Sequence, residues 1–421
     1  MKENLLESGV RSSEDRGVLQ YAPTHDTRLG TQTRVALTGN DAVALAFKQV
    51  DPDVAAVYPI TPQTELMHKF ADYVSNGEVH TELMLVESEH SAMSASIGAS
   101  AAGARTITAT SSQGLALMWE MLYIAASYRL PIVMVDVNRA LSGPLNIHCD
   151  HSDTMGCRDT GLIQLFSENS QEAYDNTIQA FRIAEHPDVQ LPVMVTLDGF
   201  IISHTVEALK VFDDEVVKAF VGEYEPLRSL LDTDNPITMG PLDLPNYYFE
   251  HKRQQVEAME RSRKVISTVG NEFEKISGRK YGFFEPYKLD DAELAIVLLG
   301  STAGTAKDAV DLLREEGIKA GLLKLRVFRP FPGRQIIKAL ANVRAVGIFD
   351  RSISFGLEGG PLFNEVRSFA FESNFKMASF IYGLGGRDIN VAQIRDVFLK
   401  LNEIKDTGRT DIPVQYIGLR E

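Results

Sequence analysis

ESEHSAMSASIGASAAGARTITATSSQGLALM, residues 87–118, is the most informative segment of the sequence for the fold class. It begins as a strand that carries Glu87 and Glu89, continues as a helix built almost wholly of Ala, Ser and Gly, and returns as a buried strand at Thr106–Ala109. Strand, helix and strand in this order are typical of a parallel sheet covered by helices. Because small residues let backbones approach closely, the helix is expected at a tight domain or subunit interface.

The same alternation continues on both sides of this stretch. Four further strands are expected at Val35–Gly39, Asp53–Pro59, Ile132–Val137 and Val193–Thr196. Asn40 is a candidate N-cap for a helix over Asp41–Gln49. A second α/β unit begins with the buried strand AELAIVLLG at residues 292–300, followed by Ser301 and Thr302 as candidate helix caps. The fold class is therefore α/β, with a doubly wound, mostly parallel sheet followed by a second α/β domain.

Changes in polarity, periodicity and proline content along the chain suggest four segments. Residues 1–33 are polar, show no sustained periodicity and are expected to form an extended N-terminal arm. The first α/β domain spans 34–210, a Pro-rich connector with a charged helix spans 211–285, and the second α/β domain spans 286–421.

Composition excludes several classes of function. The formal net charge of -15 argues against a broad surface for nucleic acid or anionic lipid. No apolar run is long enough for a membrane span, and the first residues lack the apolar core of a signal peptide, so a cytoplasmic location without a membrane is expected. The two cysteines, Cys149 and Cys157, match no zinc or iron-sulfur spacing and are expected simply to pack.

Two segments at strand ends could bind a substrate. In YPITPQTE, residues 58–65, Thr61 could offer a hydroxyl to an oxyanion or carbonyl, although Thr61 as N-cap and Pro62 at the first helical position would explain the segment equally well. Arg139 at another strand end could bind a small carboxylate bidentately. The polar turn Ser111–Gly114 could line a pocket mouth or serve only as a strand-helix turn.

Acidic and histidine side chains supply the other candidates. Glu89 could face a cofactor nitrogen or could cap the helix, which is the commoner role of such a residue. A loop further on carries five polar residues that could bind a metal but are better explained by salt bridges and turn hydrogen bonds: His148, Asp150, His151, Asp153 and Asp159. No metal site is therefore assigned.

Several common motifs are absent from the sequence. GxGxxG, GxxxxGK[ST] and GxSxG do not occur in their required settings, which argues against dinucleotide binding, P-loop phosphate binding and hydrolase chemistry. A GDG segment of the kind that holds Mg and diphosphate is also missing. A phosphate anchor, if one exists, must therefore come from elsewhere.

Five stretches together resemble the α subunit of multi-subunit pyruvate:ferredoxin oxidoreductases, over roughly residues 34–405. They are YPITPQTE, the segment 87–118, NRALSGPLNIHCDHSDTMGCRDTG, LPVMVTLDGF and LLKLRVFRPFP. The resemblance implies that residues 34–210 form a thiamine diphosphate pyrimidine-binding domain and that residues 286–421 form a transketolase C-terminal-like domain with an architectural role. The arm at residues 1–33 departs from the usual α subunit, which starts close to the first strand.

The resemblance also implies roles for five residues. Glu89 falls on the glutamate that hydrogen-bonds the aminopyrimidine ring and favours its imino tautomer, with the neighbouring Glu87 as second choice. Thr61, with Pro59 and Ile60 in the cofactor-binding ITP loop, falls on the threonine that contacts the 2-oxoacid. Arg139 falls on the arginine that receives the substrate carboxylate.

The implied reaction is the coenzyme A-dependent oxidative decarboxylation of pyruvate to acetyl-CoA and carbon dioxide, with electrons passed to ferredoxin. Thiamine diphosphate would be shared with a β subunit that carries the diphosphate-binding domain, Mg and iron-sulfur clusters would be on partner subunits, and γ- and δ-type subunits would be ferredoxin-like. Coenzyme A is implied as co-substrate.

Two alternatives stay open. The same chemistry could act on branched-chain 2-oxoacids, 2-oxoglutarate or oxalate, because pocket walls from other segments can shift the preference. A different class of function is a non-catalytic assembly scaffold. The presence of Thr61, Glu89 and Arg139 together argues against the scaffold.

Overall fold

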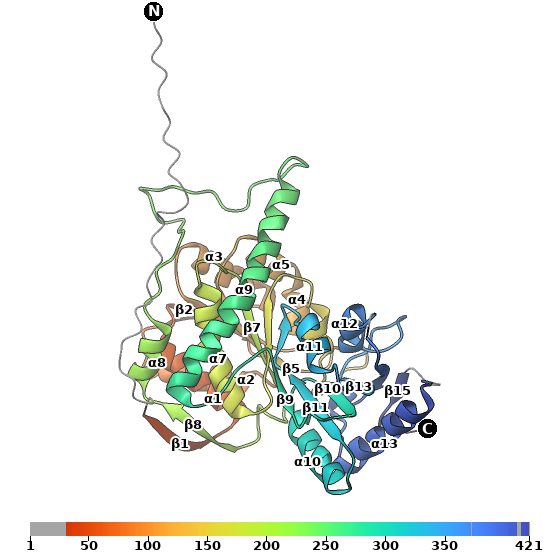
Figure 1. Ribbon diagram of the computed structural model, residues 1–421. Helices are drawn as coiled ribbons and strands as arrows, with labels where there is room; N and C mark the ends of the chain where they lie inside the picture. Colours follow the sequence, from red (N-terminus) through yellow and green to blue (C-terminus); the bar gives the residue numbers. More distant parts are fainter. Residues whose placement is uncertain (1–30, 372, 411–413, 421) are drawn as a thin grey trace, which may run out of the picture.

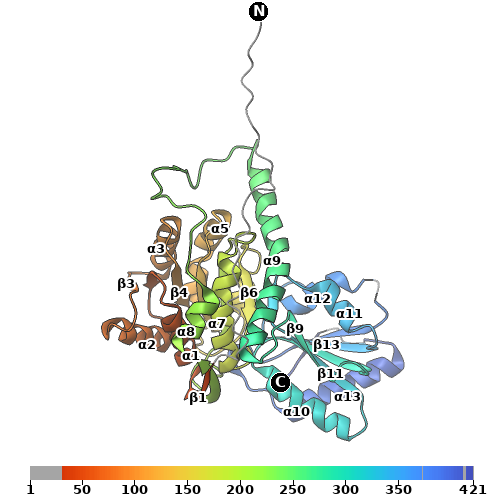
Figure 2. The ribbon, with the colours of Figure 1, turned by 60° about the vertical axis from the view of Figure 1, so that its left-hand side comes forward.

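The computed structural model describes residues 31–371, 373–410 and 414–420. The chain forms two α/β halves that lie side by side (Figures 1 and 2). The predicted arm lies outside the described residues up to residue 30, and its end already belongs to strand β1 (Gln32–Leu37). β1 pairs antiparallel with β8 (Glu207–Phe212) in a separate ribbon. The first predicted strand therefore exists, but it does not belong to the main sheet.

The first half is built on a sheet with the order β12-β6-β7-β5-β4-β2-β3 among the described residues. These strands are, in the same order, Val327–Arg329, Ile163–Phe166, Val193–Asp198, Val133–Asn138, Thr106–Thr110, Val54–Val57 and Glu82–Leu85. All neighbours are parallel except β12, which runs antiparallel to β6. From β2 the chain continues to β3, the neighbour of β2 on one side, and then crosses to β4, the neighbour of β2 on the other side. This reversal of direction creates a topological switch point between β2 and β4. Ligands of doubly wound sheets bind at such points, outside the carboxyl ends of the strands.

Apolar helices cover both faces of this sheet. One apolar core includes side chains of α1 (Gly39–Val50), α2 (Thr64–Ser75), α7 (Ser170–Glu185), α8 (Asp214–Val221) and α9 (Tyr248–Ser277). A second core includes side chains of α3 (Glu89–Ala101), α4 (Gln113–Leu117) and α5 (Trp119–Ser127). The short helix α6 (Ser152–Gly156) follows β5.

The second half has a sheet of order β15-β14-β13-β10-β11-β9 among the residues described. Its strands are Val414–Tyr416, Lys376–Ile381, Ala345–Asp350, Leu294–Leu298, Ala320–Leu325 and Phe284–Tyr287. One core contains α10 (Thr302–Glu315) and α13 (Val391–Thr407), and the other contains α11 (Gly333–Ala339) and α12 (Pro361–Phe369), with a 3-10 turn at Leu384–Gly386. The predicted fold class is confirmed.

Strand β12 joins the two halves, because it comes from the second half of the chain yet pairs with β6 of the first sheet. The boundaries at residues 210, 211, 285 and 286 remain a prediction. The charged helix expected in the connector is α9, which is 30 residues long and projects from the body of the molecule (Figures 1 and 2). In the described part of the chain, no helix is both long and apolar enough to cross a membrane.

Candidate active site

The loop between β2 and α2 lies at the switch point and carries Thr61. Its shape is held by Gln63, whose side-chain Oε1 accepts from the amide of Ile60 at 3.2 Å and whose own amide donates to the Ile60 carbonyl at 2.8 Å. The side chain of Asn40 donates to the carbonyl of Pro62 at 3.0 Å. These contacts present Pro59 and Thr61 at the surface with Ile60 half-buried between them.

Capping does not explain this loop. Helix α2 begins at Thr64 with Gln63 as its N-cap, so the alternative with Thr61 as cap and Pro62 at the first helical position is wrong. Asn40 does not cap α1 either, because the Thr38 side chain accepts from the amide of Asp41 at 3.1 Å and the helix starts at Gly39. The prediction of an Asn40 cap is therefore wrong, and Asn40 supports the Thr61 loop instead.

Arg139 follows β5 and reaches the same loop. Its side chain is only 7% exposed. Nη1 donates to the carbonyl of Thr61 at 2.9 Å, and Nε donates to the carbonyl of Asn146 at 3.0 Å. Nη2 of Arg139 and the hydroxyl of Thr61 have no hydrogen-bond partner among the described residues. The structure therefore brings these two predicted site residues into direct contact and leaves donors of both free.

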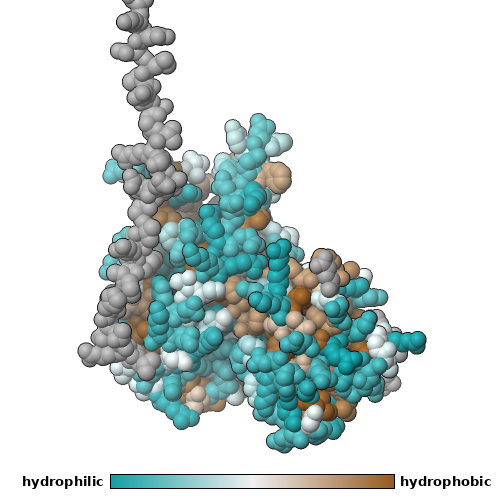
Figure 3. Space-filling model, viewed as in Figure 1, coloured by the Kyte–Doolittle hydropathy of each residue, from teal (hydrophilic) through white to brown (hydrophobic). Residues whose placement is uncertain are grey.

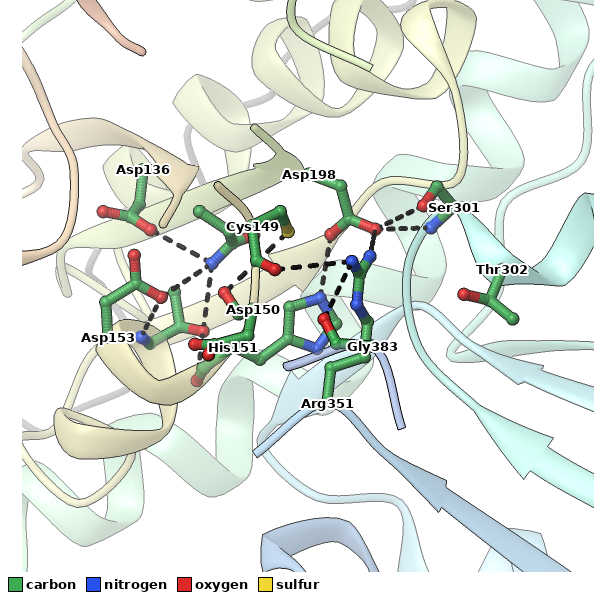
Figure 4. A network of polar contacts seen from close by, with 12 residues as sticks. Asp136, Cys149, Asp150, His151, Asp153, Asp198, Ser301, Thr302, Arg351 and Gly383 are labelled. Carbon is green, nitrogen blue, oxygen red and sulfur yellow. Dashed lines mark hydrogen bonds and ion pairs between the residues drawn. The ribbon is translucent and has the colours of Figure 1, made fainter. Parts of the chain in front are cut away.

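Asp153 connects the ends of β4 and β5. Its Oδ2 accepts from the backbone amides of Arg139 at 2.8 Å and Ser112 at 3.1 Å, and its Oδ1 accepts from the Asn138 side chain at 3.1 Å. Asp136 lies beside it (Figure 4). Burial, and then the charge of Asp153, raise the pKa of Asp136 well above its ordinary range. Burial also raises the pKa of Asp153, although the hydrogen bonds that Asp153 accepts act in the opposite direction.

Glu89 is the first residue of helix α3, after the end of β3. The expectation that Glu89 belongs to the strand is therefore wrong. Its carboxylate lies next to Gly114, because a Cβ built on that glycine would come within 2.9 Å of Glu89 Oε1 and 2.3 Å of Thr110 Oγ1. Glu89 follows an edge strand, yet its side chain reaches the end of β4, at the switch point.

Glu89 is only 8% exposed as a residue, and its carboxylate forms no hydrogen bond or ion pair within the described ranges. The neighbouring Thr110 hydroxyl is also buried without a partner there. Helix capping is done by Ser88, whose side chain accepts from the amide of Ser91 at 3.2 Å, so the capping explanation of Glu89 is wrong. A nearly buried carboxylate without a hydrogen-bond partner destabilises the fold unless a ligand supplies that partner. A cofactor ring that is protonated or carries an N–H group could donate the missing hydrogen bond.

Glu87, the second choice for the same role, has a different environment. It is exposed, and its Oε1 accepts from the Ser91 hydroxyl at 2.7 Å. This hydrogen bond lowers the pKa of Glu87. Glu87 therefore already has a partner near the helix start, whereas Glu89 does not.

The loop after Arg139 is held by the second half of the chain. Asn146 donates to the carbonyl of Gly385 at 3.1 Å, and the amide of Gly386 donates to the carbonyl of Cys149 at 2.7 Å. Because Asn146 also receives the Nε hydrogen bond of Arg139, the C-terminal half helps to place this arginine.

Asp198, at the end of β7, is the centre of a buried network between the halves (Figure 4). Arg351 and His151 each lie 2.8 Å from its carboxylate, and the Ser301 amide donates to it at 3.0 Å. Burial alone would raise the pKa of Asp198, but Arg351 and His151 lower it far below its ordinary range. Ser301 precedes α10 as predicted, but its hydroxyl binds Asp198 and does not cap the helix.

The His and Asp residues of the 148–159 loop mostly form such hydrogen bonds. Asp150 accepts from the amide and hydroxyl of Ser152, and Cys149, His151 and Asp198 place ligand-type atoms within 4.8 Å of one another. Because the guanidinium of Arg351 already neutralises Asp198, ion pairing accounts for this cluster.

The structure thus brings Thr61 and Arg139 into contact and places Glu89 against the turn that carries Gly114. Sequence reasoning assigned no role in the site to Asp198 and considered Asp153 only as a possible ligand. Hydrogen bonds from backbone amides to a carboxylate have no characteristic sequence pattern. The roles of Asp153 and Asp198 could therefore not be predicted from the residues around them. Gly114 belongs to the turn Ser111–Gly114, for which the sequence leaves a pocket mouth and a plain strand-helix turn as alternatives.

Comparison with solved structures defines the class of fold. The chain superposes on a 2-oxoglutarate:ferredoxin oxidoreductase from Magnetococcus marinus, solved with 2-oxoglutarate, coenzyme A and succinyl-CoA bound, with a TM-score of 0.70 and 22% identity over 87% of this chain and 65% of that one. A split-gene transketolase, described as an inactive beta4 tetramer, gives a TM-score of 0.52 and 11% identity over 88% of this chain and all of that one. Both share the fold.

Comparison of sequences gives the family. Residues 45–271 match "Pyruvate flavodoxin/ferredoxin oxidoreductase, thiamine diP-bdg", and residues 292–394 match "Pyruvate:ferredoxin oxidoreductase core domain II". Pyruvate synthase subunit PorA of Thermotoga maritima is 58% identical over 92% of this chain and 98% of that protein, and ketoisovalerate oxidoreductase subunit VorA of Pyrococcus abyssi is 43% identical over 91% and 97%. The chain belongs to the family of pyruvate flavodoxin/ferredoxin oxidoreductases with a thiamine diphosphate-binding domain, and the predicted α-type subunit of a 2-oxoacid:ferredoxin oxidoreductase is confirmed.

Proposed function

We propose that this α-type subunit acts on pyruvate, in a complex that converts pyruvate and coenzyme A to acetyl-CoA and carbon dioxide and passes two electrons to ferredoxin. The names of the relatives support this substrate, since the proteins from Thermotoga maritima at 58% identity and Methanocaldococcus jannaschii at 48% are both pyruvate synthase subunits. The presence of candidate cofactor and substrate residues at the switch point argues against a scaffold without catalytic activity.

The observation that carries the cofactor assignment is the nearly buried Glu89 carboxylate without a partner among the described residues. We assign Glu89 to the aminopyrimidine nitrogen of thiamine diphosphate, where it would hold a proton. Bound thiamine diphosphate supplies a nucleophilic carbon and an electron sink for decarboxylation. Pro59 and Ile60 are assigned to the same cofactor.

Thr61 and Arg139 are assigned to the 2-oxoacid. The free Nη2 of Arg139 would bind the carboxylate, and the Thr61 hydroxyl would donate to the keto oxygen, where negative charge develops. The hydrogen bond from Arg139 to the Thr61 carbonyl keeps the two donors in one unit. Asp153 supports them by holding the Arg139 amide.

The remaining parts of the reaction are assigned to partner subunits in the cytoplasm. The chain has two cysteines, both buried, too few to bind an iron-sulfur cluster with four thiolates. We therefore assign the clusters to γ- and δ-type subunits, and the diphosphate site with Mg to a β subunit. Coenzyme A would enter as the acyl acceptor.

The test is to purify the complex through a tag on this chain and to measure 2-oxoacid-dependent reduction of a viologen dye with coenzyme A present. Pyruvate is expected to give the highest kcat/KM among pyruvate, 2-oxoisovalerate, 2-oxoglutarate and oxalate. A different best substrate would overturn the assignment of pyruvate and keep the family. Absence of thiamine-dependent activity with every acid would support a scaffold.

A second candidate substrate is a branched-chain 2-oxoacid, because ketoisovalerate oxidoreductase subunits VorA of two Pyrococcus species are 43% and 42% identical to this chain. Both kinds of substrate share the carboxylate and keto group that Arg139 and Thr61 would bind. Residues in other walls of the pocket would discriminate between the acyl side chains of the two substrates. The same assay separates the two candidates.

A further inference from the structure

A cavity of about 450 Å³ lies where the end of α5, the segment 222–247 and helix α9 meet. In a parallel sheet, a crossover helix returns the chain to the amino ends of the strands, so the residues between α5 and β5 lie opposite the candidate active site. A second cavity of about 120 Å³ shares Tyr128, Arg129 and Arg228 with the first. The cavity belongs neither to the proposed substrate site nor to the proposed cofactor site.

Three arginines that line the cavity or lie on its helix α9 have no acidic partner among the described residues. Arg129 and Arg228 line it, and Arg261 lies on α9 two turns after the lining residue Gln254. None of the three arginines forms an ion pair with an acidic residue in the described part of the chain. The acidic lining residue, Asp243, is paired with His251. In a chain with a net charge of -15, three neighbouring arginines without carboxylates are unusual.

Arg129 and Arg228 line both cavities, which places these two arginines at the same site. Burial, then Arg261 and Arg228, lower the pKa of Arg129 to about 10, so it stays charged at neutral pH although its neighbours repel it. Among the described residues, its side chain donates only to the backbone carbonyls of Val189 at 2.6 Å and Gln190 at 3.1 Å. An anion placed among the three guanidinium groups would relieve this repulsion.

The walls of the cavity are held in place. Arg129 has φ 62°, a left-handed conformation that usually favours glycine at the end of a helix. Gly240 lets the Tyr128 hydroxyl come close, since a Cβ there would lie 2.1 Å from that oxygen. The segment that carries Arg228 is tied to α3, because the Ser229 hydroxyl donates to the carbonyl of Ala102 at 2.6 Å. The backbone of Arg129 and of the segment that carries Arg228 is therefore held beside the cavity.

We propose that this cavity is a binding site for a small organic phosphate with a dianionic phosphate or diphosphate group. Guanidinium groups bind phosphate oxygens bidentately, and more than one positive charge favours a multiply charged group. Ile237 and Met239 add apolar wall for the organic part of the ligand. The larger cavity has the size of ordinary small-molecule sites.

The test uses the purified complex saturated with thiamine diphosphate and Mg, so that the diphosphate site assigned to the β subunit is filled. Binding of inorganic pyrophosphate, the probe, is then measured by isothermal titration calorimetry. Saturable binding is expected for the native complex, weakened at least about tenfold by the double change Arg228→Gln and Arg261→Gln, since each charge-assisted hydrogen bond contributes strongly. Arg253→Gln is the matched control, because Arg253 is exposed on α9 and paired with Glu257. Its affinity should be unchanged. Absence of saturable binding to the native complex, or equal binding by the double variant, would overturn the proposal.

A second measurement distinguishes a phosphate from carboxylates of a partner subunit. The segment around the cavity exposes large apolar side chains, including Leu227, Leu231 and Leu242, and the projecting end of α9 carries apolar side chains among mostly hydrophilic ones (Figure 3). If partner carboxylates occupy the arginines, pyrophosphate will not bind the native complex and the double variant will co-purify less of one subunit. That result would contradict a small-molecule site. The proposal predicts unchanged subunit composition in both variants.

Discussion

Nη1 of Arg139 donates a hydrogen bond to the carbonyl oxygen of Thr61 at 2.9 Å, which joins the end of β5 to the loop after β2. The two residues are 78 positions apart in the chain. The contact uses the backbone of Thr61 and one nitrogen of Arg139, and it leaves the Thr61 hydroxyl and Nη2 of Arg139 without partners in the described residues. The proposed substrate site is thus one preassembled unit.

Replacement of Arg139 should weaken 2-oxoacid binding selectively. We expect Arg139→Ala to raise KM for the 2-oxoacid about 30- to 100-fold, the size of a lost charge-assisted pair, and to change KM for coenzyme A less than about twofold. Steady-state kinetics with each substrate varied in turn measure both values. Arg334→Ala, an exposed change on α11, is the control. Equal increases in the two KM values would contradict the carboxylate-binding role.

The two glutamates near the start of α3 should behave differently. Glu89→Gln should lower kcat at least about 100-fold, because an amide cannot exchange the proton that the carboxyl group holds. Glu87→Gln should change kcat less than about threefold, since its carboxylate is occupied by Ser91. Dye reduction at saturating substrates gives both rates. Similar losses for the two variants would argue against a special role of Glu89.

Gly114 should be required for the position of Glu89. A Cβ at Gly114 would lie 2.8 Å from Glu89 Cγ, so Gly114→Ala should displace the carboxylate and lower kcat about 10- to 100-fold. The control is Gly98→Ala in α3, where a Cβ would meet no atom within 4 Å and should stabilise the helix by about 0.5–1 kcal/mol. Kinetics and thermal unfolding of both variants test this pair. Full activity of Gly114→Ala would show that the carboxylate tolerates the shift.

The network at Asp198 should make stability depend on pH. Its pKa in the folded protein is far below the unfolded value, so its contribution is complete above about pH 4 and is lost as the pH falls below that value. Asp198→Asn should reduce the free energy of unfolding by about 3–5 kcal/mol at pH 7, because Arg351 would remain buried without a countercharge. Urea unfolding at pH 7 and at pH 2.5, more than one unit below the ordinary aspartate pKa, measures the difference. A loss of the same size at both pH values would contradict this explanation.

Local pattern predicted much of the fold. The strands at β2, β4, β5 and β7 are near their expected positions because buried parallel strands are short apolar runs with turn residues at their ends. The predicted first strand was placed in the wrong sheet, and β12 was not expected beside β6. Strand partners are chosen by contacts between distant residues, which leave little trace in a local pattern.

Periodicity and long collinear motifs in the sequence were enough to predict the fold class, the family and the candidate residues Thr61, Glu89 and Arg139. Only the tertiary structure decided that Thr61 and Arg139 touch, that Glu89 is a helix residue without a partner in the part described, and that Asp153 and Asp198 hold the surrounding loops. The physical reason is that each of these properties depends on hydrogen bonds and burial between segments tens of residues apart.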